Sequence, residues 1–167
     1  MKKQFILLTV LLFFLTTQLV ISQKIIIDSE TGTYTSEQII KVDNITRNQL
    51  FDNAMEWVAL NYKSAQDVIQ YSNKESGKII CKGAFPTNLF MKTGHINHTL
   101  TLEFKEGRYR QIFSNFSYYS SGTGELAFES KNMGFKKKIY KEANNNIILS
   151  TLSLKKYLTT SKTNDDW

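Results

Sequence analysis

Residues 46–62 carry the clearest helical pattern in the chain. Apolar side chains recur there at steps of three and four, which places them on one stripe of a helix: Leu50, Phe51, Ala54, Trp57, Val58 and Tyr62. Thr46 precedes this run and Gln49 follows three positions later, a capping-box arrangement in which each side chain binds the other residue's backbone N–H. The pattern predicts a helix that starts after Thr46 and packs Trp57 into the core.

Alternating apolar and polar residues predict strands on both sides of this helix, at 40–43 before it and at 68–71 and 78–86 after it. Asn73 to Gly77 is a turn-rich link that joins the last two as a hairpin, and Pro86 closes the second of them. Alternation is expected to turn one set of apolar side chains to the same side of the strands: Ile40, Val42, Ile69, Tyr71, Ile79, Cys81 and Phe85. Ile80 and Ala84 fall on the other side with Lys78 and Lys82.

A second hairpin is predicted over 100–105 and 108–113, with Glu106-Gly107 as its two-residue loop. This loop sets Phe104 opposite Tyr109 on the apolar side, and it sets Glu103 opposite Arg110 on the polar side. Beyond Phe113 the alternation fails, and 120–124 is typical of a mobile loop.

The remainder of the chain gives a weaker pattern. Between Glu125 and Lys141 only 126–128 and 139–140 suggest short extended pieces. Asn144 or Asn145 is expected to cap a final helix whose apolar residues approximate helical spacing: Ile148, Leu149, Leu152, Tyr157 and Leu158. The predicted order is therefore strand, helix, about four antiparallel strands, helix. Both helices are amphipathic, and each strand has one apolar side. The simplest way to bury these apolar surfaces is an α+β two-layer domain with both helices on one face of a curved antiparallel sheet.

The first 22 residues are typical of a secretory signal peptide. Lys2 and Lys3 precede an apolar run from Phe5 to Leu15, and Val20-Ile21-Ser22 suits a signal peptidase. No cysteine stands at the cleavage point, so the product is expected to be exported, periplasmic or secreted, without a lipid anchor there. An uncleaved membrane anchor stays an alternative, because Thr16 to Ile21 could extend the apolar run. No later apolar run is long enough to cross a bilayer.

Cleavage would leave one domain over 23–160 and a polar tail over 161–167. Loss of Lys2 and Lys3 lowers the formal net charge from +6 to +4, a mild excess that favours anionic partners. Cys81 is the single cysteine, so no disulfide forms within the chain, and its position among aliphatic residues predicts a buried thiol of low reactivity.

Several spaced motifs resemble an exported bacterial family of unknown function whose fold is like that of the TATA-binding protein (TBP-like). The motifs are IDSETG at 27–32, WVALNY at 57–62, KSAQDVIQ at 63–70, KESGKII at 74–80, GRYR at 107–110 and the closing DDW at 165–167. The resemblance covers most of residues 25–120 and implies the same strand-helix-four strands-helix order. It implies no catalytic residue. Cys81, where a small residue is expected, and the run Lys136 to Lys138 depart from the family pattern.

The sequence contains no recognisable catalytic motif. Gly122-Thr123-Gly124 lacks the lysine and the strand-to-helix context of a phosphate loop, and no serine stands in a nucleophile elbow. His95 and His98 are the only histidines; they are expected to be surface residues of a loop, and their spacing would turn them to opposite sides of a strand. No metal site and no cofactor are expected. A small hydrolase or enzyme inhibitor with a site near the Gly122 loop and His95 and His98 stays an alternative.

The polar side of the predicted sheet is basic. Its candidate ligand-binding residues are Lys41, Lys78, Lys82, Lys105, Arg108 and Arg110. They predict a binding module for an anionic envelope component or an acidic protein, although a merely solvated sheet face has the same composition. Nucleic acid is not expected as a partner, because Tyr109 faces the core and leaves no stacking platform.

Overall fold

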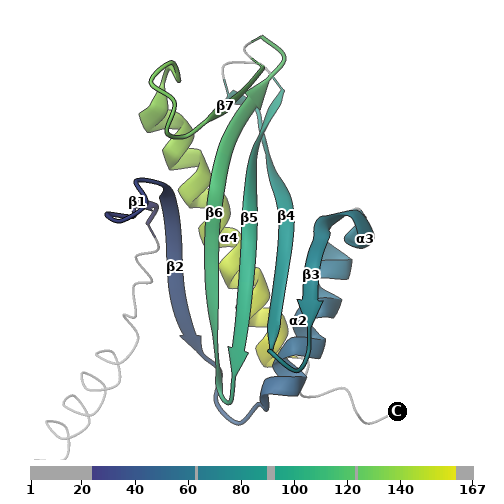
Figure 1. Ribbon diagram of the computed structural model, residues 1–167. Coiled ribbons are helices and arrows are strands. Elements are labelled where there is room, and N and C mark those ends of the chain that lie inside the picture. The colour runs from purple at the N-terminus through teal and green to yellow at the C-terminus, as the bar shows by residue number, and fades with distance from the viewer. Residues whose placement is uncertain (1–23, 63, 90–92, 123, 161–167) are drawn as a thin grey trace, which may run out of the picture.

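A computed structural model describes residues 24–62, 64–89, 93–122 and 124–160. The predicted signal peptide and the predicted tail over 161–167 lie outside this described part. In the described part, an antiparallel sheet forms one layer and two long helices form the other (Figure 1). This arrangement confirms the predicted α+β class and the placement of both helices on one face.

The elements follow in the order β1 (Ile26–Ile27), β2 (Tyr34–Lys41), α2 (Arg47–Asn61), α3 (Ala65–Val68), β3 (Ile69–Asn73), β4 (Lys78–Thr87), β5 (Gly94–Lys105), β6 (Arg108–Ser120), β7 (Gly124–Ala127) and α4 (Lys136–Thr160). The strands lie in the order β1-β2-β6-β5-β4-β3, and β7 pairs with the far end of β6. The predicted core of strand, helix, four strands and helix is present, and β1 and β7 add short pieces at the margin.

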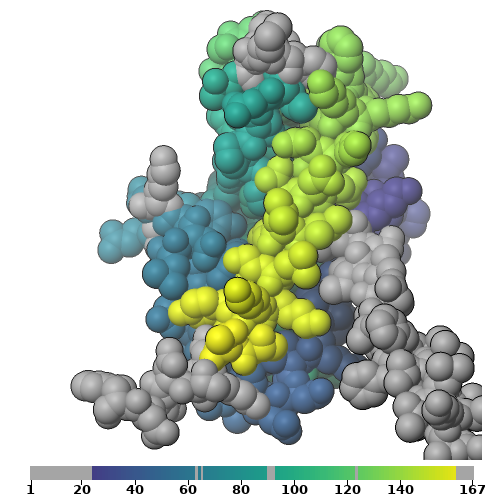
Figure 2. Space-filling model, turned by 180° about the vertical axis from the view of Figure 1, so that it is seen from behind, coloured from purple at the N-terminus to yellow at the C-terminus, as the bar shows by residue number. Residues whose placement is uncertain are grey.

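Helix α2 starts as the sequence predicts. The Thr46 hydroxyl accepts from the Gln49 backbone N–H at 3.3 Å, and the Gln49 side chain accepts from the Thr46 backbone N–H at 3.1 Å, so the capping box forms. The apolar stripe of α2 is buried from Leu50 to Val58. Trp57 packs toward α4 and donates its indole N–H to the Ser153 hydroxyl at 3.0 Å. Seen from behind, α4 runs obliquely across the molecule with α2 beside its C-terminal half (Figure 2).

A buried polar contact also ties the sheet to α4. The Gln111 side chain on β6 donates to the Thr151 hydroxyl at 2.8 Å, and that hydroxyl donates to the Ile147 carbonyl one turn earlier. Both side chains are almost fully buried. Because a buried polar group is costly without a partner, this contact favours one register of α4 over the sheet.

The second hairpin has the predicted register. Phe104 lies opposite Tyr109 and Glu103 opposite Arg110, across a two-residue loop in which Gly107 has φ of +66°. Along β5 the side chains at Leu100, Leu102 and Phe104 are buried, while their neighbours are exposed or half-buried. Side-chain alternation therefore divides the strands between a helix-covered face and an uncovered face, which we call the open face.

Several expectations about where elements begin and end are wrong. The final helix begins at Lys136, eight residues before Asn144, and Ile139 and Tyr140 are helical instead of extended. Ile139, Ala143 and Ile147 are buried at steps of four, so packing against the sheet outweighs the lysine-rich start, whose charges are unfavourable at a helix N-terminus.

Strand β6 continues to Ser120 although alternation in the sequence stops at Phe113. The register between β5 and β6 shifts between the pairs of Asn97 and Thr99, and Asn115 takes a φ of +53° there. This β-bulge adds one residue to β6, so that Phe116 and Tyr118 again face the helices. The segment predicted as a mobile loop connects β6 directly to β7, whose Gly124 lies opposite Ser120.

A second bulge changes the facing of Tyr71. The register of β3 against β4 shifts between Ile69 and Tyr71, and Tyr71 lies opposite Ile80, which faces away from the helices. Tyr71 is 44% exposed. The expectation that Tyr71 shares the inner side with Ile69 is therefore wrong, because the extra residue reverses the alternation.

Removal of the α2 cap should destabilise the fold. Thr46→Ala removes the hydroxyl that binds the Gln49 N–H, and we expect a loss of about 1 kcal/mol in the free energy of unfolding. Urea unfolding followed by circular dichroism measures this loss. An unchanged midpoint and slope would show that the capping box does not stabilise α2.

Candidate functional site

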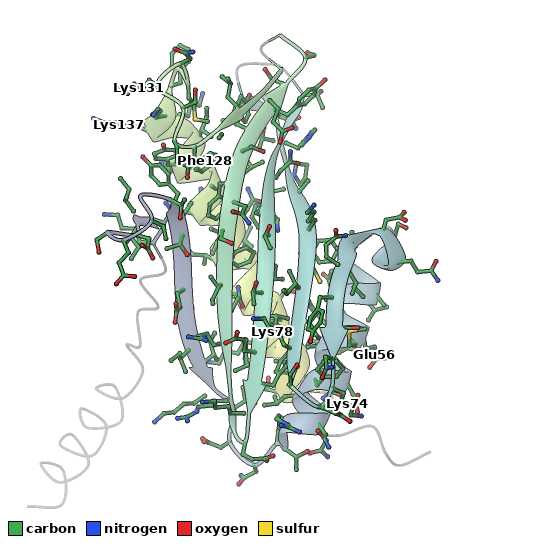
Figure 3. All side chains as sticks on the ribbon, in the orientation of Figure 1. Glu56, Lys74, Lys78, Phe128, Lys131 and Lys137 are labelled. Carbon is green, nitrogen blue, oxygen red and sulfur yellow. The ribbon has the colours of Figure 1, made fainter. Side chains whose placement is uncertain are left out.

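The six cationic side chains singled out from the sequence all lie on the open face. Strand alternation turns them away from the buried positions of their strands: Lys41 on β2, Lys78 and Lys82 on β4, Lys105 on β5, and Arg108 and Arg110 on β6. Figure 3 shows Lys78 on this side of the sheet, with the helices behind. The structure thus brings the six together on one surface but divides them into three environments.

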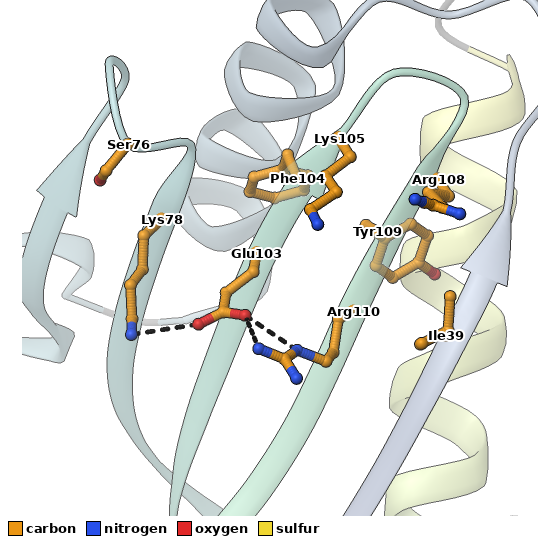
Figure 4. A pocket seen from close by; sticks show the side chains of 9 residues that line it. All are labelled: Ile39, Ser76, Lys78, Glu103, Phe104, Lys105, Arg108, Tyr109 and Arg110. Atoms are coloured by element: carbon orange, nitrogen blue, oxygen red, sulfur yellow. Dashed lines mark hydrogen bonds and ion pairs between the residues drawn. The ribbon is translucent and has the colours of Figure 1, made fainter.

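Lys78 and Arg110 belong to an ion-pair cluster centred on Glu103. Lys78 Nζ lies 3.1 Å from Glu103 Oε1, and Arg110 Nε donates to Glu103 Oε2 at 2.8 Å (Figure 4). A second arginine nitrogen also binds Glu103, and Arg110 Nη1 lies 3.5 Å from Glu37 Oε1 on β2. Hydrogen bonds from Arg110 first, and then from Lys78, lower the pKa of Glu103. These two cations are therefore largely neutralised by carboxylates of the same face.

Lys41, Arg108 and Lys105 form a row across three neighbouring strands, which we call the cation row. Arg108 lies opposite Lys41 on β2 and opposite Lys105 on β5, at the end of the sheet where the β5–β6 turn lies. All three side chains are exposed, and within the described residues none of them forms an ion pair. The neighbouring Glu106 carboxylate instead accepts from the Arg47 backbone N–H at 3.1 Å.

A hollow of about 480 Å³ connects the cation row with the Glu103 cluster. Lys105 and Arg108 line it together with Lys78, Arg110 and Ile39 (Figure 4). Since Arg108 keeps all its guanidinium donors free of carboxylates in the described structure, it can bind a carboxylate or phosphate with two parallel hydrogen bonds.

Lys82 lies apart from the cation row, beside a groove of about 660 Å³ near the other end of the sheet. The groove is lined from both sides of the sheet, since Tyr62 and His98 of the helix side border it as well. There Asn97 donates to Glu125 Oε1 at 2.7 Å, and Ser117 also binds this carboxylate. The hydrogen bond from Ser117, followed by that from Asn97, lowers the pKa of Glu125. Neither Glu125 nor Asn97 is recognisable as a site residue in the sequence, because β7 and the bulge that aligns Ser117 with Asn97 carry no clear pattern.

The two histidines occupy opposite sides of β5, as their spacing predicts, but they are not in a loop. His95 is on the open face and stacks on Tyr119 with ring centres 4.8 Å apart. His98 is only 2% exposed on the helix side, where it stacks on Phe85 at 4.0 Å. The expectation of a loop is wrong for both histidines because β5 begins at Gly94. The expectation of a surface position is wrong for His98 alone, because alternation turns its side chain toward the helices.

Burial keeps the groups around His98 uncharged near neutral pH. It raises the pKa of the Cys81 thiol to about 11 and lowers the pKa of His98 to about 4. Burial and, after it, the charge of Cys81 raise the pKa of Tyr62. A thiolate–imidazolium pair needs the opposite shifts, so these residues do not form an activated nucleophile.

The described residues contain neither a metal-binding cluster nor a membrane-spanning helix. Over residues 24–160, apart from the few positions that the structure leaves undescribed, no three His, Cys, Asp or Glu side chains are grouped so as to hold a metal ion. In the same part of the chain, no helix combines the length and apolar character of a membrane span.

The strand order and the two helices on one face define an α+β domain of the TBP-like class. The model of a family described as a domain of unknown function (DUF4468) with TBP-like fold matches residues 37–119. The chain belongs to this family across that segment, which confirms the resemblance seen in the sequence.

Solved structures show the same fold. A TBP-like protein from Parabacteroides distasonis ATCC 8503 superposes with a TM-score of 0.68 at 12% identity, covering 80% of this chain and 97% of that one. A DUF4468 family protein from Bacteroides ovatus ATCC 8483 gives 0.58 at 14% identity, with 77% and 90% covered. A search of curated proteins finds no significant match. These likenesses establish the architecture and assign no activity.

The burial of His98 predicts a loss of stability in mild acid. The pKa of His98 is about 6.5 in an unfolded chain and about 4 in the folded one, so the unfolded state binds more protons between these values. The free energy of unfolding should have its full value above about pH 6.5, and it should fall by about 3 kcal/mol as the pH drops to 4.

Urea unfolding at a series of pH values measures this dependence. The matched variant His98→Leu has no imidazole to protonate, and its stability should be flatter between pH 6.5 and 4. If the free energy of unfolding depends on pH in the same way in both proteins, the fold does not hold His98 neutral.

Proposed function

We propose that this protein is an exported, non-enzymatic binding module that engages an anionic partner through the cation row. The observation that carries this proposal is the row itself: Lys41, Arg108 and Lys105 come from three adjacent strands, are exposed, and form no ion pair within the described structure. Neighbouring cations repel one another, so their grouping on a rigid sheet is costly unless an anion offsets it.

The contrast within the open face supports the same assignment. A face that only needs to be solvated is satisfied by mixed charges, as in the Glu103 cluster, where Glu103 and Glu37 surround Arg110. The cation row departs from that pattern at one end of the sheet. Lys78 and Arg110 would then border the site as ion-paired residues, and Lys82 would not take part.

The chemistry of the row suits carboxylate or phosphate groups. Arg108 offers a forked pair of donors, and the two lysines add flexible point charges on either side. The signal-peptide pattern of residues 1–22 supports a partner outside the cytoplasm, such as an anionic envelope polymer, a lipid headgroup or an acidic protein surface.

Reversal of two charges in the row should abolish most of this binding. In Lys105→Glu/Arg108→Glu, affinity for vesicles that contain phosphatidylglycerol, or for a carboxylated polysaccharide, should fall about 30-fold or more, since each cation near an anionic surface contributes about 1 kcal/mol. Co-sedimentation at low and at physiological salt measures the affinity, and wild-type binding should weaken as salt rises.

The chain offers a matched control. Lys131→Glu/Lys137→Glu changes the net charge equally but acts at the end of the molecule opposite the β5–β6 turn (Figure 3). Its binding should remain close to that of the wild type. Equal losses in both variants would mean that binding follows net charge alone, and equal retention would reject the cation row as the site.

A further inference from the structure

The outer edge of β2 is open for pairing with another strand. Figure 1 shows β2 at the margin of the sheet, with β6 on its inner side. On the outer side, β1 pairs only with Tyr34 and Thr35. Within the described structure no strand pairs with the outer edge from Ser36 to Lys41. An open strand edge is a ready template for another strand unless its side chains prevent pairing.

The backbone groups on this edge belong to the odd-numbered residues. Val42 donates its backbone N–H to the Gly107 carbonyl at 2.9 Å, on the β6 side. Because the N–H and C=O groups of successive strand residues point to alternate edges, Glu37, Ile39 and Lys41 direct theirs away from β6. The pairing of Thr35 with Ile26 of β1 on the outer side agrees with this alternation.

The side chains of the same three residues form a self-complementary set. Ile39 is 61% exposed at the centre, with an anion two positions before it and a cation two positions after it. In an antiparallel pair with a twofold axis at Ile39, Glu37 of each copy lies opposite Lys41 of the other. Charged residues on an edge usually repel a second copy, but in this register opposite charges meet.

We propose that two copies of this chain associate through antiparallel pairing of their β2 edges, with Ile39 on the twofold axis. The pairs Ile39–Ile39, Glu37–Lys41 and Lys41–Glu37 are then all of the hydrogen-bonded kind, so the two strands exchange about six backbone hydrogen bonds. The two exposed isoleucines cover each other, and the sheets of both copies join into one continuous sheet whose open faces lie on the same side.

This dimer has a consequence for the cation row. Lys41 of each copy pairs with Glu37 of the other, whereas Arg108 and Lys105 stay available for an anion. The antiparallel arrangement sends the two β5–β6 turns in opposite directions, so the dimer presents two separate anion sites. The dimer itself does not depend on any ligand.

Charge reversal tests the register. The protein expressed from its full coding sequence should dimerise with increasing concentration in sedimentation equilibrium. Glu37→Lys places two lysines opposite each other at both ends of the pair, and Lys41→Glu does the same with two glutamates. Each single variant should raise the dissociation constant about 30-fold.

Two combinations give the control. Glu37→Lys/Lys41→Glu exchanges the two charges and should restore the dimer to within a few-fold of the wild type. An equimolar mixture of the two single variants should form heterodimers, since one supplies two lysines and the other two glutamates. Thermal unfolding of each variant confirms that it is folded, because Glu37 also lies near Arg110.

A wild-type protein that stays monomeric over a hundredfold range of concentration would overturn the proposal. So would a dimer that both single variants retain, because its contact would then lie elsewhere. Lys105→Glu/Arg108→Glu leaves the β2 edge unchanged and should dimerise normally, so failure of anion binding and failure of dimerisation are separable.

Discussion

Packing of α2 and α4 against a single face of the sheet is the constraint on which the rest of the structure depends. The inner side chains of β4, β5 and β6 fill the space beneath the helices, and fully buried residues such as Ile79, Leu100, Leu102 and Phe113 leave no room for charge there. Every charged strand residue must therefore appear on the other side. This division alone is enough to make the open face basic. A basic open face is therefore not by itself evidence of a binding site.

Within the open face, cross-strand neighbours decide what each cation can do. Glu103 on β5 lies between Lys78 and Arg110, so strand pairing itself neutralises the middle of the face. One step closer to the β5–β6 turn, pairing brings together three cations instead. Binding capacity thus comes from the register of β2, β6 and β5 more than from the net charge of the chain.

The parts of the fold that local physics determines could be predicted from the sequence. Thr46 and Gln49 form a cap within four residues. Glu106-Gly107 fixes the register of its hairpin, so the pairing of Phe104 with Tyr109 follows from the sequence. The six cations of the open face followed from alternation along strands that contain no bulge near them.

The remaining parts depend on contacts between distant segments. The bulges at Asn115 and beside Tyr71 reverse the alternation without a local signal, which concealed the second half of β6 and the facing of Tyr71. The start of α4 depends on Ile139 packing against the sheet, and the start of β5 depends on its partners in β4 and β6. For the same reason, the division of the cations between ion pairs and the cation row could not be read from residue types alone.

Thiol labelling along β5 tests the central claim most directly, since that claim is the separation of a covered face from an open one. Cysteines at Thr101 and Glu103 should react with a maleimide almost as fast as a free thiol, whereas native Cys81 and a cysteine at Leu102 should react only when the protein unfolds. Comparable rates at all four positions in the folded protein would contradict the account.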